Sequence, residues 1–144
     1  MRLLALDVGD VRIGVALSDP MQIISKPLEV IDRKKCKALN RIRELVIQYD
    51  IHEIIVGIPY GMDGNKTLQT EKVEEFAKKL YNKLEHKVKI HFVDERLTTV
   101  EAHEILYKLG AGNIREQKAI VDKVAAAIIL ESYLKNINVE EKIK

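Results

Sequence analysis

The chain has few of the residues that serve special stabilising chemistry. Among its 144 residues are one cysteine, Cys36, three prolines, two phenylalanines and no tryptophan. A single cysteine excludes an internal disulfide and is typical of a reducing compartment, so we expect a cytoplasmic protein. No apolar run approaches the ~20 residues of a membrane span, and no signal peptide is visible, so we expect no membrane attachment.

Neither sign of charge dominates the composition. The 24 Lys and Arg residues nearly balance the 22 Asp and Glu residues, and the formal net charge is only +2. This is too small to mark a nucleic-acid-binding protein by itself, so a basic surface would have to come from local clustering. With 47% apolar and 32% charged residues, the chain is globular. We predict one domain over residues 1–135 and a polar tail at 136–144.

The spacing of apolar residues predicts five strands and four helices in the order βββαβαβαα. We expect the strands at Leu3–Asp7, Ile13–Leu17, Leu28–Ile31, His52–Ile58 and Val88–Val93, and the helices at Arg33–Tyr49, Thr67–Leu84, Thr98–Leu109 and Glu116–Leu134. Three opening strands followed by alternating helices and strands predict an α/β fold. Its five-stranded mixed sheet would begin with an antiparallel meander and carry helices on both faces.

Carboxylates follow two of the expected strands. Asp7 ends the first strand, and Asp94 and Glu95 end the fifth. In open α/β sheets the ligand crevice lies at such C-terminal strand ends. A carboxylate there is costly to desolvate, and a cation would offset the cost; alternatively, Asp7 only binds the amides of its turn. Because strand side chains alternate, only one of Asp94 and Glu95 can project as Asp7 does, unless the strand has already ended there.

A third carboxylate, Asp122, lies in the last expected helix. Ala125 and Ala126 follow on the same helix face and would let the helix approach the sheet closely. The alternative is an ion pair with Lys118 or Lys123 on a solvated face. Three acids at one strand end repel one another unless divalent cations lie between them. That arrangement is typical of two-metal phosphodiester chemistry, and oxygen ligands favour Mg²⁺ or Mn²⁺.

Two further segments are candidates for contact with phosphate. The stretch from Arg33 to Arg43 contains six basic residues and no acid, and it is either a phosphate-binding surface or a solvated helix start. The loop Pro59–Lys66 is either a phosphate-approaching turn or an ordinary strand-to-helix connection. The residues that we select as substrate-binding candidates are Arg12, Arg33, Lys34, Lys37, Arg41, Gly61, Asp63, Gly64 and Arg96. For Arg96 the alternative is a structural ion pair with a carboxylate.

The chain resembles the YqgF family, also called RuvX, which belongs to the RNase H-like superfamily and is similar to Holliday-junction resolvases. Four blocks carry the resemblance, in family order and over nearly the whole chain. They are Asp7-Val8-Gly9 with Arg12-Ile13-Gly14-Val15-Ala16; Val56-Gly57-Ile58-Pro59 with Met62-Asp63-Gly64; Asp94-Glu95-Arg96-Leu97-Thr98-Thr99; and Val121-Asp122 with Ala125-Ala126. One departure is Val11, where the family often has lysine.

This resemblance implies that Asp7, Glu95 and Asp122 are the catalytic metal ligands, with Asp94 as a possible substitute for Glu95. It implies a nuclease that uses Mg²⁺ or Mn²⁺ in 5′-end processing of precursor 16S ribosomal RNA. A branched-DNA resolvase is one alternative, and a catalytically inactive, nucleic-acid-binding ribosome-assembly factor is another. An ATP-binding fold of the actin type needs a second domain, for which 144 residues leave no room. We expect a monomer or a weak homodimer.

Overall fold

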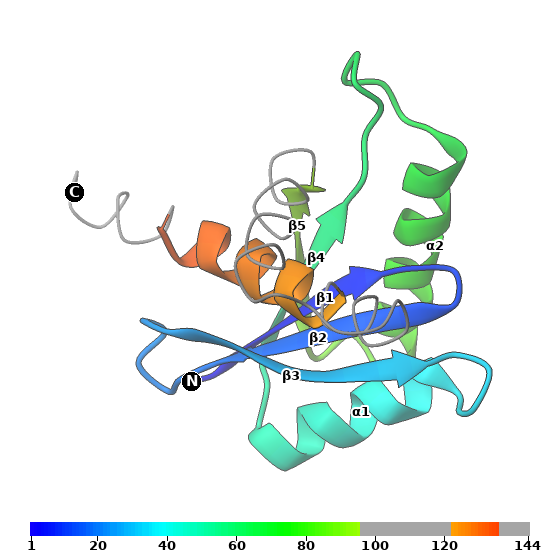
Figure 1. The fold of residues 1–144 in the computed structure, drawn as a ribbon. Coiled ribbons are helices and arrows are strands. Elements are labelled where there is room, and N and C mark those ends of the chain that lie inside the picture. Colours follow the sequence, from blue (N-terminus) through cyan, green and yellow to red (C-terminus); the bar gives the residue numbers. More distant parts are fainter. Residues whose placement is uncertain (96–121, 136–144) are drawn as a thin grey trace, which may run out of the picture.

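The computed structural model describes residues 1–95 and 122–135, which form a mixed sheet with helices on both faces (Figure 1). The elements are β1 (Leu3–Val8), β2 (Arg12–Ser18), β3 (Ser25–Asp32), α1 (Ala38–Tyr49), β4 (Glu53–Ile58), α2 (Leu68–Lys83), β5 (Lys89–Asp94) and a further helical segment at 122–135. This confirms the predicted α/β fold. The expected helix Thr98–Leu109, the start of the last helix and the tail at 136–144 lie outside the described residues.

The sheet has the strand order β3-β2-β1-β4-β5. The strands β1, β2 and β3 pair antiparallel, as the predicted meander requires, whereas β4 pairs parallel to both β1 and β5. The C-terminal ends of β1, β4 and β5 therefore lie at the same edge of the sheet, where side chains from distant parts of the sequence can meet.

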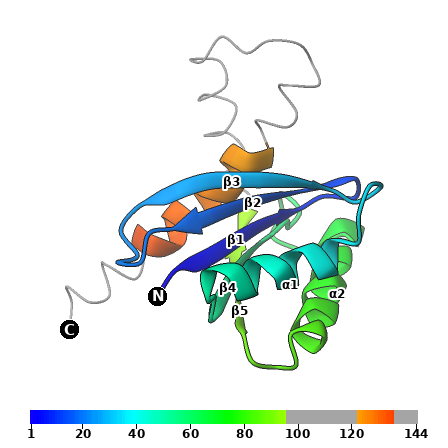
Figure 2. The same cartoon turned by 90° about the horizontal axis from the view of Figure 1, so that it is seen from below.

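Strand alternation divides the core into two layers. In β1, Leu4, Leu6 and Val8 pack toward α1 and α2, whereas Leu3 and Ala5 pack with Ala126, Ile129, Leu130 and Leu134 of the helix at 122–135. Figure 2 shows the sheet between these two helical layers. Because side chains alternate along a strand, Asp7 lies on the same face as Leu3 and Ala5, under the helix at 122–135.

The start of α1 differs from the prediction. The basic residues from Arg33 onward do not begin the helix, because the amides of Lys35 and Cys36 both bond to the carbonyl oxygen of Asp32 in a turn. The helix begins only at Ala38, and Lys37, which precedes it, gives no side-chain cap. The first buried side chain of the amphipathic face is also Ala38. Extending the helix back to Arg33 would place basic side chains at its N-terminus, where the helix dipole disfavours positive charge, and would bury no further apolar side chain.

The third strand also begins earlier than predicted, at Ser25 rather than Leu28, because Ser25 pairs with Ser18. Pro27 lies inside this strand. A proline is tolerated there because β3 is at the edge of the sheet and needs no ladder hydrogen bond on its outer side. None of the helices within residues 1–95 and 122–135 combines the length and apolarity needed to cross a bilayer.

The helix at 122–135 lies close to the sheet because two strand residues beneath it are glycines. A Cβ atom on Gly14 would occupy the position of the backbone carbonyl oxygen of Asp122. A Cβ atom on Gly57 would meet Cδ1 of Ile129, and also Cγ of Glu95 at 2.9 Å. At Gly14 the obstacle is backbone, which cannot rotate away, so this position sets how closely the helix approaches.

We therefore predict that Gly14→Ala destabilises the protein by about 1–3 kcal/mol, the usual cost of overpacking, although alanine is otherwise the better strand residue. Urea unfolding followed by circular dichroism measures the loss. Gly57→Ala is the matched control and should cost less, because its nearest neighbours are the ends of side chains. A Gly14→Ala variant as stable as the parent would contradict the close contact.

Candidate active site

Asp7 lies between two glycines in the row of residues that crosses the sheet under the helix at 122–135. Its partner in β2 is Gly14. On the other side, Gly57 follows Val56, the β4 residue that pairs with Leu6. Neither glycine has a side chain to fill the space beside Asp7, so groups from other segments can reach it.

The space over Gly57 is occupied by Glu95, which follows directly after β5. In this strand Val93 pairs with Gly57 and Asp94 with Ile58, so Asp94 lies on the opposite face and Glu95 returns to the face of Asp7. The expectation that only one of Asp94 and Glu95 would project as Asp7 does agrees with this geometry, although Glu95 itself lies just after the strand. It is Glu95 that forms a side-chain hydrogen bond with Asp7.

These two buried carboxyl groups are hydrogen-bonded to each other, and both have a raised pKa. Burial, the hydrogen bond to Asp7 and the negative charges of Asp7 and Asp94 together raise the pKa of Glu95 from 4.5 to about 10. Glu95 is thus protonated at neutral pH and donates to Asp7. Burial and the nearby charge of Asp122 also raise the pKa of Asp7, and the hydrogen bond from Glu95 opposes this. Two carboxylates in such a place cannot both be ionised without a compensating cation.

Asp122 is the third acid at this position, over Gly14 and close enough to Asp7 to raise its pKa. Its carboxylate accepts a hydrogen bond from Nε of Arg12, with 2.7 Å between Nε and Oδ2. The side chains are only 33% and 23% exposed. Among the described residues, Asp122 therefore pairs with Arg12 and not with Lys123; Lys118 lies outside the described residues, so the predicted pair with it is not tested. Arg12 bridges to an acid 110 residues away.

The donor set fits a hard divalent cation. All three side chains offer carboxylate oxygens, which Mg²⁺ and Mn²⁺ prefer, and the raised pKa values of Asp7 and Glu95 show that the site favours added positive charge. Within residues 1–95 and 122–135, however, no three acidic, histidine or cysteine side chains already stand as a metal cage. Glu95 would have to lose its proton, and Asp122 would have to turn from Arg12, before all three could ligate an ion.

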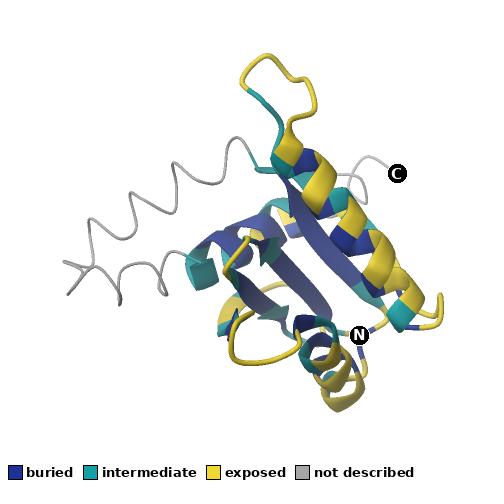
Figure 3. Cartoon of the chain, turned by 90° about the vertical axis from the view of Figure 1, so that its right-hand side faces the viewer, coloured by how far each residue is buried: buried dark blue, intermediate teal, exposed yellow. Residues whose placement is uncertain are grey.

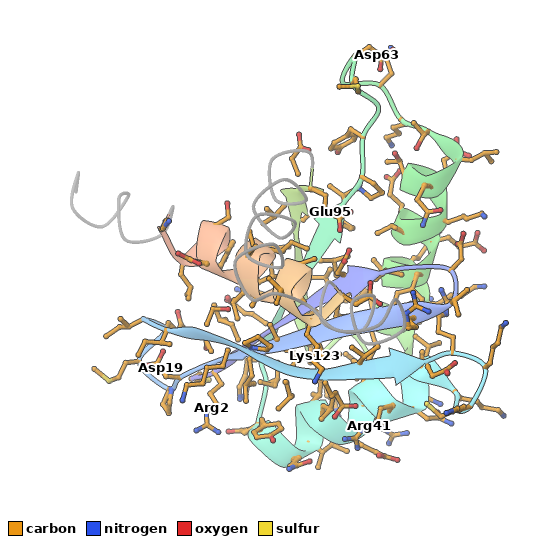
Figure 4. All side chains as sticks on the ribbon, in the orientation of Figure 1. Arg2, Asp19, Arg41, Asp63, Glu95 and Lys123 are labelled. Atoms are coloured by element: carbon orange, nitrogen blue, oxygen red, sulfur yellow. The ribbon has the colours of Figure 1, made fainter. Side chains whose placement is uncertain are left out.

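The basic candidates before and within α1 have different surroundings. Arg41 binds both carboxylate oxygens of Glu29, at 2.9 and 2.6 Å, and also contacts Glu44 at 2.9 Å. These ion pairs raise the pKa of Arg41 further. Figure 4 shows Arg41 on α1, well separated from Glu95. In this geometry the guanidinium of Arg41 ties α1 to β3, and its contact with substrate stays a prediction.

Arg33, Lys34 and Lys37 lie around the turn that precedes α1, on the side of the sheet away from Asp7. Nη1 of Arg33 donates to the carbonyl oxygen of Gly9 at 2.8 Å, which ties this turn to the β1–β2 turn. Lys34 and Lys37 are exposed. Their contact with nucleic acid stays a prediction, and Arg96 lies outside the described residues.

The loop Pro59–Lys66 is a self-contained turn. The amide of Gly61 donates to the carbonyl oxygen of Asn65, and that of Gly64 donates to Gly61. The carboxylate of Asp63 accepts from the backbone and side-chain nitrogens of Asn65. Figure 4 shows Asp63 at the tip of the loop, away from Glu95. These groups are used inside the loop, so the geometry gives no support to phosphate binding by Gly61, Asp63 or Gly64.

The glycines Gly14 and Gly57 are the functional residues that our sequence reasoning did not select. Both stand inside the motif blocks, each between β-branched or apolar residues of a strand. Glycine inside a strand signals close approach of another segment, and this was the available clue.

The fold places the protein in a structural class. Over 95% of this chain, the structure is similar to RuvC of T. thermophilus bound to a Holliday junction, with a TM-score of 0.57, 12% identity and 96% of that chain covered. It is also similar to the fowlpox virus Holliday junction resolvase, with a TM-score of 0.52, 14% identity, and 94% and 99% of the two chains covered. The fold is therefore the RNase H-like fold of the resolvases.

The chain belongs to the RuvX family, whose model, described as "Holliday junction resolvase", matches residues 1–136. A protein from Fusobacterium nucleatum is 50% identical over 92% of this chain and 96% of its own length. Another, from Ruminiclostridium cellulolyticum, is 42% identical over 95% of this chain and 96% of its own length. Both carry the name "Putative pre-16S rRNA nuclease". The family resemblance inferred from the four motif blocks is thereby confirmed.

The proton held by Glu95 predicts how the stability of the protein depends on pH. The pKa of Glu95 is about 10 in the folded protein and 4.5 without its surroundings. Between these values the folded protein holds a proton that the unfolded chain has lost, so stability falls as pH rises through this window. We predict that Glu95→Gln, measured in EDTA, is more stable than the parent at pH 8 by at least about 1 kcal/mol, since one pKa unit corresponds to about 1.4 kcal/mol.

Urea unfolding at several pH values between about 5 and 9 measures this effect, and the gap between Glu95→Gln and the parent should widen as pH rises. Glu71→Gln, at an exposed position on α2, is the control and should leave the slope unchanged. A gap that is constant or narrows with rising pH would show that Glu95 does not hold the extra proton.

Proposed function

We propose that this protein is a metal-dependent nuclease that hydrolyses phosphodiester bonds in precursor 16S ribosomal RNA, at its 5′ end, during ribosome biogenesis. The observation that carries the proposal is the meeting of Asp7, Glu95 and Asp122 at one edge of the sheet. They come from three segments that are distant in sequence. Membership of the RuvX family and the names of the relatives support nuclease activity and the choice of RNA.

In this proposal Asp7, Glu95 and Asp122 hold Mg²⁺ or Mn²⁺ as carboxylate ligands. When bound, the ion supplies water activation and charge neutralisation for attack on phosphorus. The residues of the chain prepare the site: Glu95 gives up its proton and Asp122 leaves Arg12. The freed guanidinium of Arg12 is then available to a substrate phosphate, which its planar donors suit. Arg12 thus couples substrate binding to metal binding.

We extend the proposal to the cytoplasm as the place of action and to a monomer or weak homodimer as the assembly. Precursor ribosomal RNA is a cytoplasmic substrate in bacteria, where the relatives are found. The free and exposed Cys36 suits a reducing compartment.

We predict that Asp7→Asn abolishes divalent-dependent cleavage while the circular dichroism spectrum stays native, because the substitution removes a ligand charge and keeps the shape. Cleavage is measured with Mg²⁺ or Mn²⁺ on a precursor 16S rRNA fragment. Asp50→Asn is the control, since Asp50 is exposed at the C-terminal end of α1 and lies outside the carboxylate site, and it should cleave like the parent. Activity near the parent level in Asp7→Asn would remove Asp7 from the site.

The same assay separates the alternatives. The family description and the resolvase fold favour branched DNA as the second candidate substrate, so a four-way DNA junction and a plain DNA duplex are included. Faster cleavage of the junction than of the RNA would overturn the RNA assignment. Tight RNA binding with no cleavage of any substrate would instead indicate a catalytically inactive assembly factor.

The ion pair between Arg12 and Asp122 predicts a change in metal affinity. We expect Arg12→Gln to bind Mn²⁺ more tightly than the parent when no nucleic acid is present, because Asp122 no longer has to leave an ion pair. Pairs of this kind are worth up to about 1 kcal/mol, which corresponds to about fivefold in Kd. Isothermal titration calorimetry measures it, with Arg2→Gln as the control. Weaker binding by Arg12→Gln would show that Arg12 supports the metal site rather than competing with it.

A further inference from the structure

A second surface of the molecule is suited to polyanions, and it is distinct from the carboxylate site. A cleft of about 630 Å³ lies between α1, α2 and the β1–β2 turn. Val8, in its floor, packs with the α1 and α2 layer, whereas Asp7 faces the helix at 122–135. The cleft is therefore on the opposite face of the sheet from the carboxylates. Figure 3 shows the molecule from the side of α2, whose outer face is exposed.

The charge of this cleft exceeds that of the whole protein. Five basic residues line it against only two acidic ones, Asp10 and Glu75; the basic residues are Arg33, Lys37, Lys72, Lys79 and Lys83. The surplus of three positive charges is larger than the net +2 of the chain, so the remaining residues sum to a slight negative charge. Positive charge is thus concentrated here, as in a surface that attracts an anionic partner.

This positive charge is only weakly neutralised by the protein itself. Lys72 lies 3.7 Å from Asp10 and Lys79 lies 3.5 Å from Glu75, and all four side chains are at least 59% exposed. Such exposed ion pairs contribute little to stability, so the lysines can leave their carboxylates to bind a more highly charged anion. Neither Lys37 nor Lys83 forms an ion pair with any residue in the described parts of the chain.

The arrangement is linear, which favours a strand over a small anion. Lys72, Lys79 and Lys83 fall on one face of α2 and span eleven residues, or about 16 Å at the rise of a helix. A nucleic-acid strand places several phosphates over this length. At the end of the cleft near the β1–β2 turn, the guanidinium of Arg33 lies 5.2 Å from the ring centre of Phe76 and bonds to Gly9.

We propose that this cleft binds the phosphodiester backbone of a nucleic-acid strand, at a position separate from the carboxylate site. The proposal rests on the proposed nuclease function for the identity of the strand. The β1–β2 hairpin joins the two places: Asp7 and Arg12 lie at the carboxylate site, and Asp10, in the turn between them, lines the cleft. A strand that continues past the carboxylates around this turn enters the cleft.

The single cysteine of the chain makes this proposal measurable. Cys36 is exposed and lines the cleft, so bound nucleic acid should shield it. We expect a short single-stranded RNA to slow the alkylation of Cys36 by a neutral maleimide several-fold, in EDTA so that no cleavage occurs. Inorganic phosphate at the same phosphate concentration should not. Equal labelling rates with and without RNA, or equal protection by phosphate, would overturn the proposal.

A triple variant tests which lysines are responsible. In Lys37→Ala, Lys72→Ala, Lys83→Ala, RNA should no longer protect Cys36, and the slope of log K against log salt should become shallower by about 2, since each phosphate contact contributes about 0.7 for a single strand. The matched control is Lys26→Ala, Lys78→Ala, Lys87→Ala, three exposed lysines outside the cleft. The same slope and the same protection in both variants would contradict the proposal.

The outcomes for the cleft and for the carboxylate site are separable. RNA protection of Cys36 that is unchanged in Asp7→Asn supports a cleft independent of the metal ligands. Loss of protection in Asp7→Asn would contradict that independence. Cleavage of RNA by the parent without protection of Cys36 overturns the cleft alone, and protection without cleavage overturns the nuclease function alone.

Discussion

The contact of the helix at 122–135 with the sheet, through the backbone at Gly14, is the constraint on which the site depends. A side chain at this position would overlap the carbonyl oxygen of Asp122. With glycine there, the helix brings Asp122 over β2, beside Asp7. Gly57 does the same for Glu95 on the β4 side. Close packing of one helix is thus what gathers three acids, because interiors are dense and admit no spare methyl group.

Bringing three carboxyl groups together is electrostatically unfavourable, and this explains the contacts that the three side chains make. Burial makes the ionised forms of Asp7 and Glu95 unfavourable, and the proton held by Glu95 removes one of the charges. Arg12 neutralises the third acid at 2.7 Å. Both compensations occupy positions where a cation can substitute for them. Three clustered carboxyl groups on one face and a basic cleft on the other give the molecule two chemically different surfaces around a single β-hairpin.

Local patterns were sufficient to predict much of this. Alternation along the fifth strand predicted that only one of Asp94 and Glu95 shares the face of Asp7, because strand side chains point to opposite faces. The choice of Glu95 came from the family resemblance. The apolar spacing located every described helix and strand. The error at Arg33 arose because a turn stabilised by the carbonyl of Asp32 has no apolar signature. The ion pair of Arg41 was not predicted because Arg41 lies on α1 and its partner Glu29 lies on β3, and a run of charge on one segment does not reveal pairs with another segment.

The sequence by itself determined the fold class and the family, and it proposed the three acids, because hydrophobic periodicity and short motifs are local properties that the chain carries without folding. Only the tertiary structure decided that Arg12 pairs with Asp122 across 110 residues, that Glu95 holds the proton facing Asp7, and that lysines of α2 join the turn before α1 in one cleft. These depend on distances between segments that are far apart in sequence. Such distances follow from how the layers pack rather than from any one segment.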